Sequence, residues 1–239
     1  MLKQGILYNK KHKTYPNIVH FPGIKPKTSK FWERLQKLSF YKPFELNDLT
    51  IITWNNQKEK GILEKSLDDL KIKYHVLGTD VKKWNNTIKL KLTFDFMESI
   101  KTKFVMGLDS LDVIVLNLNI IEKFQQLNCK MLFNGQEYCY PQHRYNKEVY
   151  EFVQKEQKEF QLNLNSGAWL GETKFCNSFF NECLNAKSKD KNPIEKYWNI
   201  SDQIYVRTIA QQYMPNEIKI DSFSKIFQVL ENEKELEII

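Results

Sequence analysis

The sequence lacks an apolar run near the roughly 20 residues needed to span a bilayer. Its opening residues, MLKQGILYNKKHK, contain no apolar stretch followed by a small-residue cleavage site. Cysteine is scarce, and the 4 cysteines in 239 residues show neither the paired spacing of a zinc site nor the density of a disulfide framework. We therefore expect a cytoplasmic protein of a bacterium or a virus-infected cell, with no membrane contact.

Arginine is also rare. The formal net charge is +7, but only Arg34, Arg144 and Arg207 among the 36 basic residues are arginines. The chain is rich in Asn, Ile, Phe and Tyr, whose codons are A/T-rich, so genome composition explains much of the lysine excess and favours a viral or bacterial source. Clustered lysines would also attract phosphate. Interspersed Lys and Glu, as in KEVYEFVQKEQKEF, are typical of solvated helix faces.

No internal repeat or low-complexity linker divides the chain, and 41% hydrophobic residues supply a large core, so we expect one domain over 1–239. Short apolar runs alternate with amphipathic stretches, which predicts an α/β fold with a mostly parallel sheet flanked by helices. The predicted strands are 49–53, 73–78, 103–108, 112–117, 130–135, 217–221 and 225–230, and the predicted helices are 29–38, 57–71, 88–100, 119–127, 144–160, 173–187 and 201–213.

The segment FVMGLDSLDVIVLN places Asp109 and Asp112 at the carboxyl end of a predicted strand. Such ends are where α/β sheets bind ligands. Carboxylate oxygens suit Mg²⁺ or Mn²⁺, whose coordination substrate phosphates can complete. The alternative is an ordinary polar turn.

Two later segments carry further candidates. LNLNSGAWLGE sets Asn165, Ser166 and Gly167 between apolar pieces, which predicts a tight turn where backbone approaches a ligand, or else a plain hairpin turn. NISDQIYV places Asp202 and Gln203 in the first turn of a helix. The alternative for Asp202 is helix stabilisation, worth about 0.3–1 kcal/mol.

Near the N-terminus, TYPNIVHFPGIKPK brings His20, Gly23, Lys25 and Lys27 together after a short β-branched run. This set suits a metal and a diphosphate. The alternative is an unrelated extension in which His20 is structural.

The segments LTIITWNNQKEKGILEKSLDDLKIKYHVLG, FVMGLDSLDVIVLN, KMLFNGQEYCYP, LNSGAWLGE, SDQIYV and IDSFSKIFQ, taken in order, resemble the glycosyltransferase domain of the procollagen lysyl hydroxylase and galactosyltransferase group. The resemblance covers residues 48–230. It implies a GT-A, Rossmann-like fold that uses nucleotide sugars.

In that group the two aspartates of D-x-x-D, here Asp109 and Asp112, carry a Mn²⁺ that bridges the diphosphate. The third ligand is a histidine in an H-x-x-G loop near the C-terminus of the domain. The matching loop here contains His20 and lies at the front, so the chain resembles a circular permutant. Residues 1–47 would hold the permuted metal and diphosphate loop with a connector, 48–135 the nucleotide-binding half and 136–239 the acceptor-side half.

The resemblance also assigns roles to Thr53 and Trp54, at the uridine-binding end of the first strand, and to Gly23 with Lys25 or Lys27 at the diphosphate. Asp202 matches the second acid of a D-D-Q motif, with Ser201 in place of the first. Asp202 is thus the candidate that orients the acceptor or stabilises a sugar cation, and Gln203, the last residue of the motif, is the second candidate catalytic residue.

Gln136 and Tyr140 replace an acid and a tryptophan of the group on the acceptor side, so recognition of collagen hydroxylysine is not predicted. We expect a Mn²⁺- or Mg²⁺-dependent transfer of a hexose from a UDP-sugar to a hydroxyl of a protein side chain, a glycan or a DNA base. Trp84, Tyr140 and Trp169 would stack on an extruded base, or else pack in the core. The alternative function is a catalytically inactive nucleotide-sugar or nucleic-acid binding module. The sequence leaves the oligomeric state open.

Overall fold

The structure is a computed structural model that describes residues 3–4, 6–22, 30–36, 38–39, 48–117, 119–137, 163–189, 201–230 and 233–238. The predicted helix 144–160 lies outside these residues, as do Gly23, Lys25, Lys27 and Tyr140. No helix within the described ranges is long and apolar enough to cross a membrane.

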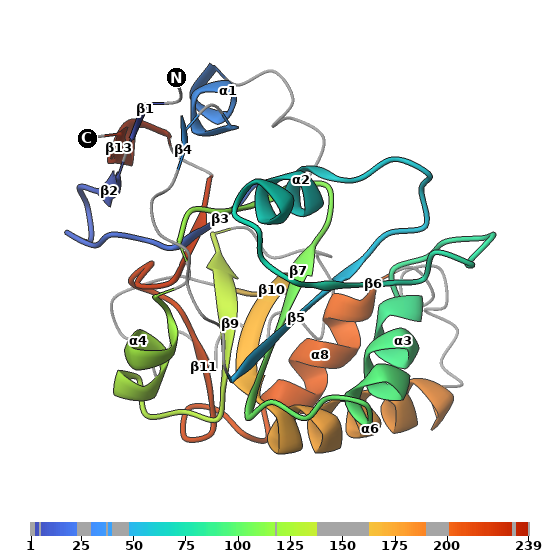
Figure 1. Cartoon of the computed structure of the whole chain (residues 1–239). Helices are drawn as coiled ribbons and strands as arrows, with labels where there is room; N and C mark the ends of the chain where they lie inside the picture. The colour runs from blue at the N-terminus through green and yellow to red at the C-terminus, as the bar shows by residue number, and fades with distance from the viewer. Residues whose placement is uncertain are drawn as a thin grey trace.

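The central sheet has six strands in the described part of the chain (Figure 1). Five run in one direction, and β10 runs opposite to both of its neighbours. The prediction of a mostly parallel sheet is therefore confirmed, and the arrangement is consistent with a GT-A-like domain. The strand order is β11 (Ile218–Ile220), β9 (Met131–Gln136), β10 (Asn163–Glu172), β7 (Phe104–Asp109), β5 (Leu49–Trp54) and β6 (His75–Leu77).

Side chains alternate between the two faces of this sheet, as the period of a strand requires. On β5, Ile52 belongs to one hydrophobic cluster and Ile51 to the other, and Val105 and Met106 of β7 divide in the same way. Because both faces are apolar, both must be covered, which fixes a layered architecture.

Three helices cover one face: α3 (Ile88–Met97), α6 (Thr173–Lys189) and α8 (Asp202–Ala210). They enclose a core rich in aromatic side chains, including Phe133, Trp169, Phe179 and Tyr205. The helices α2 (Ile62–Asp69) and α4 (Ile121–Gln126) contribute Leu63, Leu67 and Phe124 to the cluster on the other face.

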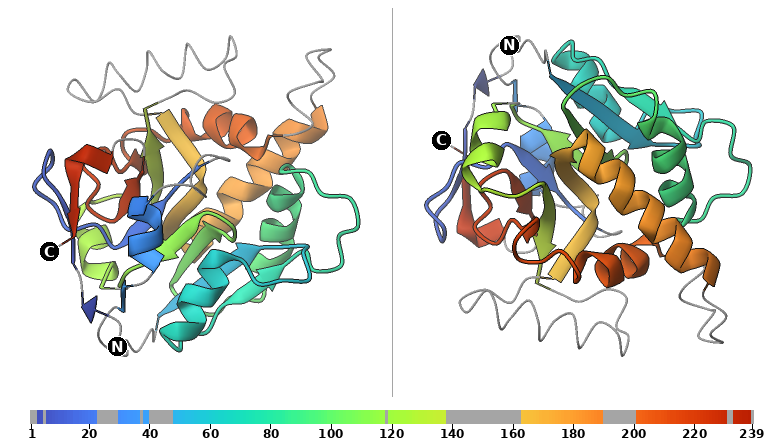
Figure 2. Two further views of the ribbon diagram at one scale, coloured as in Figure 1. Left: turned by 90° about the horizontal axis from the view of Figure 1, so that it is seen from above. Right: turned by 90° about the horizontal axis from the view of Figure 1, so that it is seen from below.

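A small second sheet joins the beginning of the chain to its end and its middle. Its order is β12 (Phe227–Val229), β3 (Ile18–His20) and β8 (Val113–Val115), with β12 parallel and β8 antiparallel to β3. The strands β2 (Leu7–Asn9) and β13 (Leu236–Ile238) pair antiparallel. The strands β2 and β13 therefore lie on the same side of the molecule (Figures 1 and 2).

Short elements complete this side: β1 (Lys3–Gln4) pairs in parallel with β4 (Leu38–Ser39), α1 spans Lys30–Gln36, and a 3₁₀ turn spans Glu233–Glu235. A third hydrophobic cluster holds the region together, with Leu7, Val19, Leu35 and Leu236 among its buried members.

Two predictions of local structure were wrong. The predicted helix 57–71 begins only at Ile62, because the Asn55 side chain accepts a hydrogen bond from the Gln57 N–H (2.8 Å) and donates to the Glu59 carbonyl (3.0 Å), which holds a loop. The predicted turn at 165–167 lies within the continuous strand β10. Strands on both sides pair with β10, and a register shift between Asn165 and Trp169 accommodates this segment without reversing the chain.

Candidate functional site

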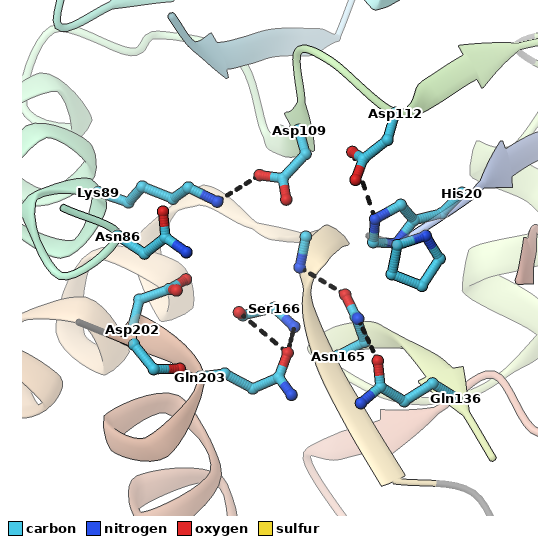
Figure 3. Close-up of a pocket in the computed structure, with 13 residues that line it drawn as sticks. His20, Asn86, Lys89, Asp109, Asp112, Gln136, Asn165, Ser166, Asp202 and Gln203 are labelled. Carbon is cyan, nitrogen blue, oxygen red and sulfur yellow. Dashed lines mark hydrogen bonds and ion pairs between the residues drawn. The ribbon is translucent and has the colours of Figure 1, made fainter. Parts of the chain in front are cut away.

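A cavity of about 460 Å³ opens where β7, β9 and β3 end and where α3 and α8 begin (Figure 3). Carboxyl ends of strands and amino ends of helices meet here, which is the usual ligand-binding edge of an α/β sheet. The lining residues are His20, Pro22, Asn86, Lys89, Asp109, Asp112, Gln136, Asn165, Ser166, Gly167, Ser201, Asp202 and Gln203.

The structure brings His20, Asp109 and Asp112 together. One ligand atom from each lies within 4.8 Å of the others, and His20 Nε2 is 3.5 Å from Asp112 Oδ1. Strand pairing sets this proximity. His20 is the last residue of β3 and lies opposite Val113 of β8, and Val113 directly follows Asp112 in the sequence. Asp109 is the last residue of β7. Within the described residues, the buried Nε2 of His20 makes no hydrogen bond.

The first turn of α2 holds the turn between the two aspartates. The buried Glu64 carboxylate accepts hydrogen bonds from Ser110 Oγ (2.6 Å), Asn55 Nδ2 (2.7 Å) and the Gly61 N–H (3.2 Å). The Leu63 N–H donates to the Ser110 carbonyl (3.0 Å). A Cβ at Gly61 would overlap Ser110, so only glycine allows the helix to approach this closely.

Lys89, in the first turn of α3, extends into the cavity and donates to Asp109 Oδ1 (2.5 Å). Burial by itself would lower the pKa of Lys89, but the nearby carboxylates of Asp109 and Asp202 outweigh burial and raise it. Lys89 therefore stays positively charged at neutral pH. Burial raises the pKa of Asp109, against the opposing charge of Lys89.

Strand β10 forms the floor of the cavity. The Asn165 carbonyl oxygen Oδ1 accepts from the Gly167 N–H (2.7 Å), and Asn165 Nδ2 donates to Gln136 Oε1 (2.5 Å). A Cβ at Gly167 would lie 2.5 Å from His20 Cε1 and 2.7 Å from Asp109 Oδ2. The glycine lets the strand pass directly against the His20, Asp109 and Asp112 group.

The first turn of α8 closes the opposite wall. Gln203 Oε1 accepts from the Ser166 N–H (3.1 Å) and from Ser166 Oγ (3.4 Å), which fastens the helix to β10. Asp202 lies beneath Lys89 across the cavity from Asp109 (Figure 3). The site thus combines a metal-type cluster with a separate buried carboxylate and a lysine between them.

The model of the PLOD GT domain family matches residues 45–238. The chain belongs to this family. The resemblance inferred from the sequence motifs is confirmed, and the chain carries the glycosyltransferase domain of the procollagen lysyl hydroxylase and galactosyltransferase group. A search of curated proteins finds no match to the chain.

Glycosyltransferase domains of the GT-A type typically use a nucleotide sugar and a divalent metal. The donor set of His20, Asp109 and Asp112 fits such a cation, because imidazole nitrogen and carboxylate oxygen both bind Mn²⁺, and the buried Nε2 has no other partner within the described chain. His20 lies outside the matched range 45–238. Its role as a ligand stays a prediction.

The structure does not bring every predicted residue into the cavity. Thr53 and Trp54 are buried and are not among the lining residues, and Trp54 Nε1 donates to Thr93 Oγ1 (3.0 Å). Their nucleotide-binding role stays a prediction. The stacking role of Trp169 is wrong: the residue is 1% exposed and packs on Phe180, with ring centroids 4.9 Å apart.

Sequence reasoning missed Lys89, Glu64 and Asn134. Lys89 and Lys91 occupy equivalent positions in the sequence pattern TIKLKL, and the structure distinguishes them because Lys89 is buried and Lys91 is exposed. Glu64 had a usable signal, because a glutamate three residues after a helix-capping position is typical of a helix start. Asn134 is a polar residue inside an apolar strand, a pattern that marks a buried side chain in need of a partner.

Proposed function

We propose that this domain transfers a hexose from a UDP-sugar to a hydroxyl acceptor, with Mn²⁺ or Mg²⁺ held by His20, Asp109 and Asp112. One observation carries the proposal: three ligand atoms, one from His20 and two from the turn between β7 and β8, lie within 4.8 Å of one another at the edge of a GT-A-like sheet. Family membership supplies the reaction class.

When bound, the cation would act as a Lewis acid on the diphosphate of the leaving nucleotide. The side chains of the protein provide the ligands for this cation and the fixed charges around it. Asp109 and Asp112 supply two negative charges and His20 a neutral nitrogen, so the ligand set stays anionic and attracts a divalent ion. Lys89 neutralises part of the charge of Asp109 and adds a fixed positive charge inside the cavity.

Asp202 is the carboxylate that we assign to the reacting sugar. It lies 6% exposed at the start of α8 and lines the cavity, apart from the metal cluster. A buried anion in this position would stabilise positive charge that develops on the sugar, or would orient the acceptor hydroxyl. Gln203 positions Asp202 by fastening α8 to Ser166.

The acceptor is a hydroxylated compound in this proposal. Amide side chains of Gln136, Asn165 and Gln203 line the cavity, and amides both donate to and accept from hydroxyl groups. Such a wall supports a glycan, a hydroxylated protein side chain or a hydroxylated DNA base. The panel of acceptors below separates them.

Circular permutation is the arrangement that we infer for the fold. The family match begins at residue 45 and ends at residue 238, and the segment with His20 precedes it. Strand β13 pairs with β2, and β12 pairs with β3, so the last matched residues lie beside the first described ones. Joining these ends would restore an order in which the histidine loop follows β12.

The test is Mn²⁺-dependent hydrolysis of a panel of UDP-sugars, followed by mass spectrometry of protein, glycan and DNA acceptors. Asp112→Ala should abolish both hydrolysis and Mn²⁺ binding. Asp95→Ala is the matched control, because Asp95 is an exposed carboxylate that pairs with Lys91. If Asp112→Ala leaves turnover intact, the metal assignment is wrong. If the protein binds UDP-sugars without turning over any of them, it is a binding module.

A further inference from the structure

Asn134 makes a contact with His20 that the proposed reaction does not use. It lies in the middle of β9, is 0% exposed, and its side-chain Nδ2 is 2.9 Å from Nδ1 of His20. Nδ1 is the ring nitrogen that points away from the aspartates, since Nε2 faces Asp112. Asn134 thus contacts the imidazole from behind the metal cluster.

The nitrogen and the oxygen of an amide have nearly the same shape, so this contact allows two arrangements: the nitrogen donates to Nδ1, or the oxygen accepts from Nδ1–H. In the first arrangement the ring proton lies on Nε2 and points toward Asp112 Oδ1, 3.5 Å away. A ring in this tautomer cannot bind a cation through Nε2, because the lone pair is used by the proton. Meanwhile Asn134 Oδ1 is buried and makes no hydrogen bond within the described residues.

A buried amide oxygen without a hydrogen-bond partner destabilises the folded state. Rotation of the amide by half a turn would place that oxygen where the nitrogen now lies, because the two ends have nearly the same shape. The oxygen would then accept from Nδ1–H, and Nε2 would carry a free lone pair. Histidine ligands of metals usually donate their other ring N–H to such an acceptor.

We propose that Asn134 is a positioning residue that selects the tautomer of His20. Its oxygen accepts a hydrogen bond from Nδ1–H, which leaves the lone pair of Nε2 free to face a cation. An alkyl group at this position could not hold the ring proton on Nδ1. The inference rests on the divalent-cation site of the proposed function.

The tautomer can be read without activity, from long-range ¹H–¹⁵N correlations of the imidazole in ¹⁵N-labelled protein. Signals of His20 are those lost in His20→Gln. We expect the proton on Nδ1 of the wild type with saturating Mg²⁺, which is diamagnetic. In Asn134→Asp, we expect Nδ1 to be protonated even without a cation, because a carboxylate only accepts.

Affinity gives a second measurement. Asn134→Leu removes both hydrogen-bonding groups, and we expect Mn²⁺ affinity to fall by about 10- to 100-fold, the usual effect of losing an outer-sphere partner. Asn163→Leu is the matched control, because Asn163 is also buried but bonds to the Glu137 carbonyl (3.0 Å) instead of the cluster. Its Mn²⁺ affinity should stay near that of the wild type.

A ring that keeps its proton on Nε2 with saturating Mg²⁺, or unchanged Mn²⁺ affinity in Asn134→Leu, would overturn the proposal. If the wild type binds neither cation, the proposed function fails, while the Asn134→Asp spectrum still shows whether residue 134 selects the tautomer. Should Asn134→Leu not fold, the wild-type and Asn134→Asp spectra decide the question.

Discussion

The backbone N–H of Phe21 donates a hydrogen bond to the carbonyl oxygen of Asp112 at 2.8 Å. This bond ties the segment that carries His20 to the turn between the two aspartates. Because it is a backbone contact that continues the β3 to β8 ladder, it fixes His20 beside Asp112 whatever the side chains do. The segment that carries His20 is therefore part of the site.

If the fold is a circular permutant, relinking should preserve it. A variant that joins Ile239 to Met1 through a short linker and opens the chain just before residue 45 should fold, with the Mn²⁺ affinity of the parent. The physical reason is that β2 already pairs with β13, so the linker need not cross the molecule. Circular dichroism melting and Mn²⁺ titration would measure this. Loss of Mn²⁺ binding in a folded relinked protein would contradict it.

Gly167→Ala should weaken Mn²⁺ binding by at least about tenfold, or about 1.4 kcal/mol. The added Cβ would lie 2.5 Å from His20 Cε1 and 2.7 Å from Asp109 Oδ2, so one ligand must move. Electron paramagnetic resonance of free Mn²⁺ measures the change.

Gly171→Ala on the same strand is the control for this glycine. Its Cβ would meet Cys176 Sγ at 2.5 Å, away from the site. We expect lower stability to urea with unchanged Mn²⁺ affinity. Equal Mn²⁺ affinities for the two variants would show that Gly167 has no special place beside the cluster.

Lys89→Met should change stability and metal affinity in opposite directions. Removing one partner of a buried ion pair costs about 3–5 kcal/mol, and because the Asp109 side chain is 24% exposed we expect about 2–3 kcal/mol. Mn²⁺ should bind more tightly, because Lys89 no longer competes for Asp109. Urea unfolding with and without Mn²⁺ measures both.

Lys91→Met on the same helix is the control for Lys89. The pair with Asp95 is 70% and 50% exposed, and such pairs contribute only about 0.3–0.5 kcal/mol. Weaker Mn²⁺ binding in Lys89→Met would mean that the lysine supports the metal cluster instead of competing with the cation.

Glu64→Ala should loosen the turn that carries both aspartates. It leaves three donors without their acceptor, at roughly 1–3 kcal/mol for each buried group that finds no water. We expect Mn²⁺ affinity to fall about tenfold, measured by calorimetry on protein that is still folded. Ser66→Ala, in the same helix but with a hydroxyl that donates to the Leu63 carbonyl, should change neither property much. An unchanged metal affinity in Glu64→Ala would limit the role of Glu64 to stability.

Local patterns in the sequence predicted much of the fold. Apolar β-branched runs at 49–53 and 103–108 became β5 and β7, and the helix predicted over 88–100 became α3. The position of Asp109 at a strand end followed from the same pattern, as did the first-turn position of Asp202. Periodicity and turn residues act over a few positions, so a sequence can specify them directly.

The sequence by itself determined which side chains have the chemistry for a cation and a sugar, and roughly where β5 to β9, β11, β12 and most of the described helices lie. Only the tertiary structure decided which of them meet. The pairing of β3 with β8 set His20 against Asp112, burial separated Lys89 from Lys91, and two flanking strands made Asn165 to Gly167 part of a strand instead of a turn. The reason is that strand pairing and burial depend on partners far away in the chain, which no local pattern encodes.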